Sequence, residues 1–75
     1  MKADTTVDAV GLLCPMPIVK LSKGVKAMES GQVLELLADD AGADSDVPAW
    51  CKKTGNEFIS SEEGDGCKKY YIRKS

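Results

Sequence analysis

The sequence predicts an α/β (α+β) fold, a two-layer sandwich in which a four-stranded mixed sheet carries two helices on one face. Three observations support this prediction. The 75 residues allow one domain, residues 1–75, with a modest core. Segments with helical spacing of apolar residues alternate with short strand-like segments. Two final strand-like runs flank Gly-Asp-Gly, which is typical of an antiparallel hairpin. The predicted element order is therefore β-α-β-α-β-β.

The first strand is expected at residues 5–10, Thr-Thr-Val-Asp-Ala-Val, and Gly11 marks the bend that follows it. The next segment is predicted to be an amphipathic helix with a basic outer face. Its apolar residues are Ile18, Leu21, Val25 and Met28, and its lysines are Lys20, Lys23 and Lys26. Gly31 is well placed for a left-handed cap after this helix.

Residues 32–39 are predicted to form a central strand, because one face holds only apolar residues and the other face is also rich in them. A second helix is expected to begin at Ser45 or Asp46, since Pro48 then falls in the first turn, where no N–H is needed. Gly55 closes this helix. Trp50 and Cys51 lie on its apolar face and are predicted to pack in the core. The hairpin strands are residues 56–63 and 67–74.

Cys14 stands where the first helix begins, in Gly-Leu-Leu-Cys-Pro-Met-Pro. Two registers remain open: Cys14 as the N-cap with Pro15 as the first helical residue, or a helix that begins at Pro17. In both registers the thiol lies near the positive end of the helix dipole, which lowers a cysteine pKa and favours nucleophilic attack. The effect is limited, because only the N–H groups of Met16 and of the cysteine itself remain as nearby donors.

Composition excludes several classes of protein. A net charge of -2 does not suit a general nucleic-acid or membrane binder. Tyr70 and Tyr71 alternate faces and cannot form a joint stacking platform for RNA. The N-terminus lacks the apolar core of a signal peptide, so a cytoplasmic protein is expected.

Three cysteines without a Cys-x-x-Cys pair, and no histidine, predict neither a disulfide framework nor a zinc site. Asp39 and Asp40 are expected to cap backbone donors, and no metal or cofactor is expected.

The three cysteines have different expected environments. Cys51 is expected in the core, and Cys67 exposed at the start of the last strand. Cys14 is either a small apolar residue that fills space or a reactive thiol. A rigidly mounted, unpaired thiol suits transfer of a group better than dithiol redox chemistry, and the absence of histidine argues against a Cys-His hydrolase.

The sequence resembles the TusA/SirA family of small sulfur-carrier proteins. "DAVGLLCPMPIVK" resembles the family's Gly-Leu-x-Cys-Pro-x-Pro signature, "GQVLELLADDAGADSDVPAWCKKTGNEF" its Ala-Asp-Asp-Pro and Asp-Ile-Pro-Ala-Trp segments, and "YYIRK" its last strand. The resemblance implies a relay protein rather than a free-standing enzyme. Cys14 would hold a persulfide between a protein donor, such as a cysteine desulfurase or rhodanese, and a protein acceptor. The motif residues that carry over are Gly11, Pro15 and Pro17.

Two positions differ from the family pattern. Met16 stands where members that feed tRNA thiolation often carry glutamate, and Ala41 replaces a proline.

The lysines at 20, 23 and 26 are either a solvated helix face or a docking surface for an acidic partner protein. The alternative function is a regulatory or protein-interaction module in which Cys14 senses redox state. A monomer is expected, with the oligomeric state left open.

Overall fold

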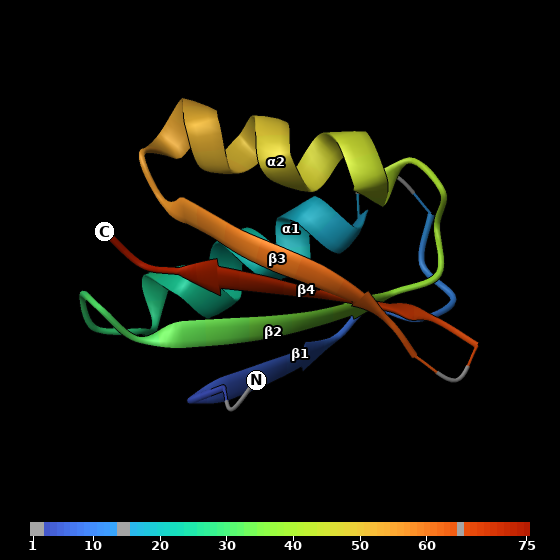
Figure 1. Cartoon of the computed structure of the whole chain (residues 1–75), viewed down its shortest axis with the longest axis horizontal. Helices are drawn as coiled ribbons and strands as arrows, with labels where there is room; N and C mark the ends of the chain where they lie inside the picture. The colour runs from blue at the N-terminus through green and yellow to red at the C-terminus, as the bar shows by residue number, and fades with distance from the viewer. Residues whose placement is uncertain (1–2, 14–15, 65) are drawn as a thin grey trace.

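The elements follow the predicted order in the computed structural model, which describes residues 3–13, 16–64 and 66–75. They are β1 (Thr5–Asp8), α1 (Met16–Lys26), β2 (Val33–Ala38), α2 (Ala43–Thr54), β3 (Glu57–Glu63) and β4 (Lys68–Arg73). The strands form one sheet in the order β1-β2-β4-β3 (Figure 1). Strand β1 is parallel to β2, and the other neighbouring pairs are antiparallel. The predicted mixed sheet with a central second strand is confirmed.

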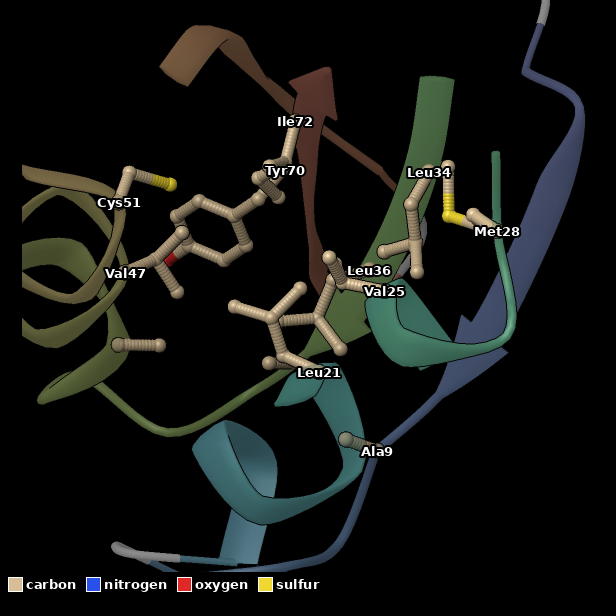
Figure 2. Close-up of a cluster of buried hydrophobic side chains, with 12 residues drawn as sticks. Ala9, Leu21, Val25, Met28, Leu34, Leu36, Val47, Cys51, Tyr70 and Ile72 are labelled. Atoms are coloured by element: carbon tan, nitrogen blue, oxygen red, sulfur yellow. The ribbon is translucent and has the colours of Figure 1, made fainter. Parts of the chain in front are cut away.

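The core lies between the sheet and both helices. Strand β2 alternates half-buried and buried residues, as its sequence predicts, and the buried set is Leu34, Leu36 and Ala38. Figure 2 shows Leu21 of α1 and Val47 of α2 directed toward the same sheet residues, among them Tyr70. Trp50 is half-buried and packs against this cluster, in agreement with its predicted core role. Two helices therefore share one face of the sheet.

The first strand and the first helix end earlier than the sequence predicts. Strand β1 stops at Asp8 rather than at residue 10, because the Asp8 carboxylate accepts the Val10 N–H at 3.0 Å and turns the chain. Helix α1 ends at Lys26. A hydrogen bond of 3.1 Å from the Met28 N–H to the Val25 carbonyl, three residues earlier, tightens the chain at this end. Gly31 is left-handed, with φ of 88°, but it lies in the turn before β2 and does not cap the helix.

Helix α2 begins at Ala43, before the predicted start at Ser45 or Asp46. Its first turn forms through short-range bonds, such as the Ala43 N–H to the Asp40 carbonyl at 3.0 Å and the Ser45 N–H to the Gly42 carbonyl at 3.2 Å. Pro48 therefore lies inside the helix and has no N–H to donate to the preceding turn. The expectation that Pro48 must fall in the first turn is wrong, because this helix tolerates one missing hydrogen bond after its first turn.

The hairpin strand β3 is an edge strand with an irregularity. A β-bulge falls between Phe58 and Ser60 where β3 pairs with β4, and the sequence did not predict it. Gly55 is the left-handed C-cap before this strand, as predicted, with φ of 82°. Within the described residues, neither helix is long and apolar enough to cross a membrane.

The last strand places its two tyrosines on opposite faces, as predicted. Tyr70 pairs with Leu36 on the helix side, and Tyr71 pairs with Glu35 on the other side. Tyr71 is nevertheless only 2% exposed. Its hydroxyl donates to Glu35 Oε2 at 2.7 Å, and the Thr6 hydroxyl donates to Glu35 Oε1 at 3.1 Å. One carboxylate on β2 thus joins all three neighbouring strands β1, β2 and β4.

Both tyrosines are expected to resist ionisation in the folded protein. The hydrogen bond to Glu35, together with burial, raises the pKa of Tyr71 from 10.0 to about 12. Burial, with the hydrogen bond to Asp44, raises the pKa of Tyr70 as well. Because the folded pKa lies above the unfolded value, this contribution to stability is full below pH 10.0 and is lost as pH rises toward about 12.

An alkaline titration followed by the ultraviolet absorbance of tyrosinate, with circular dichroism as the monitor of folding, tests this. Tyrosinate is expected to appear above pH 10.0 and together with unfolding. A midpoint near pH 10.0 in protein that is still folded would show that the two hydroxyls are not held as described.

Candidate functional site

The loop after β1 carries the predicted motif, and a hydrogen bond holds its first part. Gly11 is exposed and has a φ of 85°, a left-handed conformation that glycine adopts without strain. Its N–H donates to Asp39 Oδ1 at 2.9 Å, which ties this loop to the turn after β2. Cys14 and Pro15, the predicted sulfur-bearing residue and its neighbour, lie outside the described residues. Their register is therefore not tested.

The described start of α1 differs from one of the two expected registers, and the register with Pro15 as the first helical residue is not tested. The helix includes Met16, so it begins before Pro17, the later of the two expected starts. The Met16 N–H donates to the Leu13 carbonyl at 2.9 Å. One of the two donors that the sequence left near the Cys14 thiol is thus already engaged. Pro17 has a fully buried side chain, which anchors the helix start to the core.

The turn after β2 faces the same end of the sheet, because β1 and β2 are parallel (Figure 1). Asp39 and Asp40 accept backbone N–H groups, from Gly11 at 2.9 Å and from Gly42 at 3.2 Å, in agreement with the predicted capping role. A pocket of about 160 Å³ adjoins this turn. Its lining combines acidic, basic and thiol groups, namely Asp39, Asp40, Asp44, Cys67, Lys68 and Tyr70.

Asp44 is the centre of a polar cluster at this pocket. Its Oδ1 accepts the Lys68 ammonium at 2.8 Å and the Tyr70 hydroxyl at 2.7 Å. These two hydrogen bonds, the Lys68 bond first, lower the pKa of Asp44. The pKa of Lys68 is raised in return, chiefly by its bond to Asp44. The sequence does not predict this cluster, because Lys68 and Tyr70 follow Asp44 by 24 and 26 residues and only the packing of α2 on β4 brings them together.

The three predicted docking lysines lie on the exposed side of α1. Lys20, Lys23 and Lys26 are all exposed, as the helical spacing predicts. The Lys20 ammonium reaches back to the Asp8 carbonyl at 3.5 Å, so it stays beside the end of β1. Positive charge therefore borders the loop that contains the motif.

The other two thiols differ in access. Cys51 lies on the buried side of α2 and is 2% exposed in the core (Figure 2). Burial raises its pKa from 9.0 to about 11. Cys67 is half-buried rather than exposed, because it lines the pocket and a bond of 2.8 Å from the Gly64 N–H to its carbonyl closes the turn around it. Among the described residues, no group of three or more histidine, cysteine or acidic side chains could hold a metal ion.

Comparison with known proteins supports the resemblance found in the sequence. The family model for sulfurtransferase TusA matches residues 5–74. The sulfur carrier protein TusA of Allochromatium vinosum is 46% identical over 72 residues, which cover 96% of this chain and 95% of that protein. YrkF of Bacillus subtilis is 45% identical over 74 residues, and the chain spans only 40% of its length.

The structural comparison agrees with the sequence comparison. The crystal structure of a SirA-like protein from Desulfitobacterium hafniense superposes with a TM-score of 0.73 at 25% identity, covering 92% of this chain and 95% of that one. The predicted two-layer fold is thereby confirmed, and the solved structure of the SirA-like protein shares it. The chain belongs to the TusA family of sulfur-carrier proteins.

Proposed function

We propose that this chain, as a single domain of residues 1–75, holds sulfur as a persulfide on Cys14 and relays it from a protein donor to a protein acceptor. The observation that supports this most is the family match over residues 5–74, which includes the Cys-Pro-x-Pro motif. The environments of the other thiols agree. Cys51 is buried with a raised pKa, so it lacks the access that a carrier needs. Cys67 is half-buried in the hairpin turn.

The transfer step exchanges one sulfur–sulfur bond for another. The Cys14 thiolate attacks the outer sulfur of the donor's persulfide and forms a new bond to it. The bond between that sulfur and the donor's cysteine breaks, and its electron pair leaves with the donor as a thiolate. No net oxidation or reduction takes place, so neither cofactor nor metal is required. The same step runs from Cys14 to the acceptor's thiol.

Several properties of the carrier belong to the same proposal. The donor is of the cysteine desulfurase or rhodanese-like class, and the acceptor is a thiol protein. Gly11, Pro15 and Pro17 shape the loop, and Lys20, Lys23 and Lys26 assist docking. We place the protein in the cytoplasm, where thiols stay reduced, and expect it to act as a monomer without direct contact to nucleic acid or membrane.

The Cys14→Ser variant is expected to lose all sulfur loading while it keeps the fold. Serine has a similar size, but its hydroxyl forms no persulfide. Purified protein is incubated with a cysteine desulfurase and cysteine, and the mass of the intact chain is measured by mass spectrometry. The wild-type chain is expected to gain the mass of a single sulfur, reversed by a thiol reductant, and the variant is expected to gain none.

Two matched controls identify the sulfur-bearing residue. Cys51→Ser and Cys67→Ser are each expected to load like the wild type if they fold. A Cys14→Ser chain that still gains sulfur would move the site to Cys51 or Cys67. A wild-type chain that gains no sulfur from a desulfurase, a rhodanese with thiosulfate, or inorganic polysulfide would refute the carrier function and favour a redox-sensing thiol.

A further inference from the structure

Two segments of the chain meet where the parallel strands β1 and β2 end. One is residues 9–13, which follow β1 and precede Cys14 in the sequence, and the other is the turn at residues 39–42, which follows β2. Figure 1 shows both segments at the same end of the sheet. The hydrogen bond of 2.9 Å from the Gly11 N–H to Asp39 Oδ1 joins them across 28 positions of the sequence.

The neighbouring hydrogen bonds of residues 9–13 give this segment its local shape. The Val10 N–H donates to the Asp8 carboxylate at 3.0 Å, and the Leu12 N–H donates to the Ala9 carbonyl at 3.2 Å. Both bonds join residues close in the sequence, and the half-buried Leu12 side chain adds an apolar anchor to the core. The bond to Asp39 differs from them, because it ties the backbone of the segment to the end of a central strand.

Gly11 is the residue of this segment with the least conformational preference of its own. Its φ is 85°, and glycine populates positive and negative φ about equally well. The sequence alone therefore leaves the chain free to take several directions after Val10. The hydrogen bond to Asp39 selects one of them, so the side chain of Asp39 determines a backbone conformation that Gly11 itself does not.

The two adjacent carboxylates of the turn have different contacts. Asp39 reaches out of the turn to Gly11, whereas Asp40 Oδ1 accepts the Gly42 N–H at 3.2 Å within the turn itself. Asp40 thus shapes the turn that leads into α2. Asp39 acts on the segment that precedes Cys14.

We propose that Asp39 is a positioning residue for sulfur transfer, because its hydrogen bond to Gly11 holds the segment before Cys14 in the conformation that accepts sulfur from a protein donor. The inference rests on the proposed function. Cys14 follows Gly11 by only three residues, so a change of backbone direction at Gly11 alters the path of the chain toward it. Transfer between two proteins needs aligned sulfur atoms, and a misplacement of about 1 Å can cost about 100-fold in rate.

The Asp39→Ala variant removes the acceptor of this hydrogen bond. A cysteine desulfurase with cysteine serves as the protein donor, and inorganic polysulfide serves as a small donor that can approach a thiol from many directions. We expect the loading rate at saturating carrier concentration to fall about fivefold with the desulfurase, the factor by which loss of one typical hydrogen bond shifts an equilibrium. The carrier concentration for half-maximal rate and the rate with polysulfide are expected to stay within about twofold of the wild type, because the contact positions the chain and takes no part in the exchange of bonds.

The Asp39→Asn variant tests whether the hydrogen bond or the charge matters. The amide oxygen of asparagine accepts the same N–H without carrying a charge, so this variant is expected to load from the desulfurase within about twofold of the wild-type rate. Asp40→Ala removes the neighbouring carboxylate, whose bond to Gly42 stays within the turn, and is expected to load like the wild type. Circular dichroism is expected to show that all three variants are folded, because one exposed hydrogen bond is a small part of the stability of a domain.

The outcomes separate the role of Asp39 from the carrier function. If Asp39→Ala loads from the desulfurase at the wild-type rate, Asp39 does not position the segment, while the carrier function stands. An Asp39→Asn variant as slow as Asp39→Ala would assign the effect to charge, and an equal loss in Asp40→Ala would assign it to folding of the turn. Either result would overturn the inference, as would an equal loss of loading from polysulfide in Asp39→Ala. A wild-type chain that loads from neither donor would overturn the proposed function and this inference together.

Discussion

Replacing Gly24 with valine is expected to destabilise the fold by about 3 kcal/mol, the upper part of the usual range for an overpacked core. A Cβ at Gly24 would lie 2.8 Å from Leu34 Cδ1 and 2.9 Å from Val7 Cγ2, closer than such atoms approach in real structures. Leu34 is fully buried and Val7 packs against the core, so neither has room to withdraw. Helix α1 would have to move away from β1 and β2.

The size of this effect matters because small domains have little stability to lose. A chain of 75 residues is expected to have a free energy of unfolding of roughly 4 to 11 kcal/mol. Urea unfolding of wild type and variant measures the change. Lys23→Val places the same side chain on the exposed side of α1 and is expected to cost less than about 1 kcal/mol, since only helix propensity changes. An unchanged urea midpoint for Gly24→Val would contradict the close approach of α1 to the sheet.

Alkylation of Cys51 in the folded protein is expected to be at least about 100-fold slower than that of an ordinary thiol at neutral pH. Burial raises the pKa of Cys51 from 9.0 to about 11, and each unit reduces the reactive thiolate about tenfold. Burial also blocks the reagent, since Cys51 is 2% exposed. The expected order of reaction is Cys14, then the half-buried Cys67, then Cys51.

Timed labelling with iodoacetamide, followed by peptide mass mapping, gives the three rates separately. In a denaturing concentration of urea the rates are expected to become similar, because burial no longer distinguishes the thiols. Modification of Cys51 as fast as that of Cys67 in folded protein would contradict the packing of α2 on the sheet. A Cys14 that reacts more slowly than Cys67 would remove the argument that a helix start activates it.

Features that depend on the local sequence period were predictable. The alternation of β2 and the apolar side of α1 both follow from residue spacing, because each side chain's face is fixed by its place in the strand or helix. The start of α2 was not predictable from the proline rule alone. Short-range bonds around Gly42 add a turn that no rule based on Pro48 foresees.

Features that depend on contacts between distant segments could not be predicted. The Asp44 cluster forms only when α2 meets β4, and the approach of Gly24 to Leu34 depends on how tightly α1 packs. The exposure of the apolar side chains of Met16 and Val19 was not predicted, for another reason. Helical spacing identified the buried side of α1, and Met16 and Val19 do not belong to it, so nothing in the pattern distinguished them from ordinary surface residues.

The bulge in β3 bears on how the carrier stays available to its partners. Strands β1 and β3 end the sheet, and an open strand edge can pair with the edge of another molecule. Strand β1 is short, with only four residues. Strand β3 is longer, but the bulge after Phe58 interrupts its regular geometry, and the strand carries charged side chains, among them the exposed Glu62. Both edges of the sheet thus disfavour sheet-to-sheet pairing between copies.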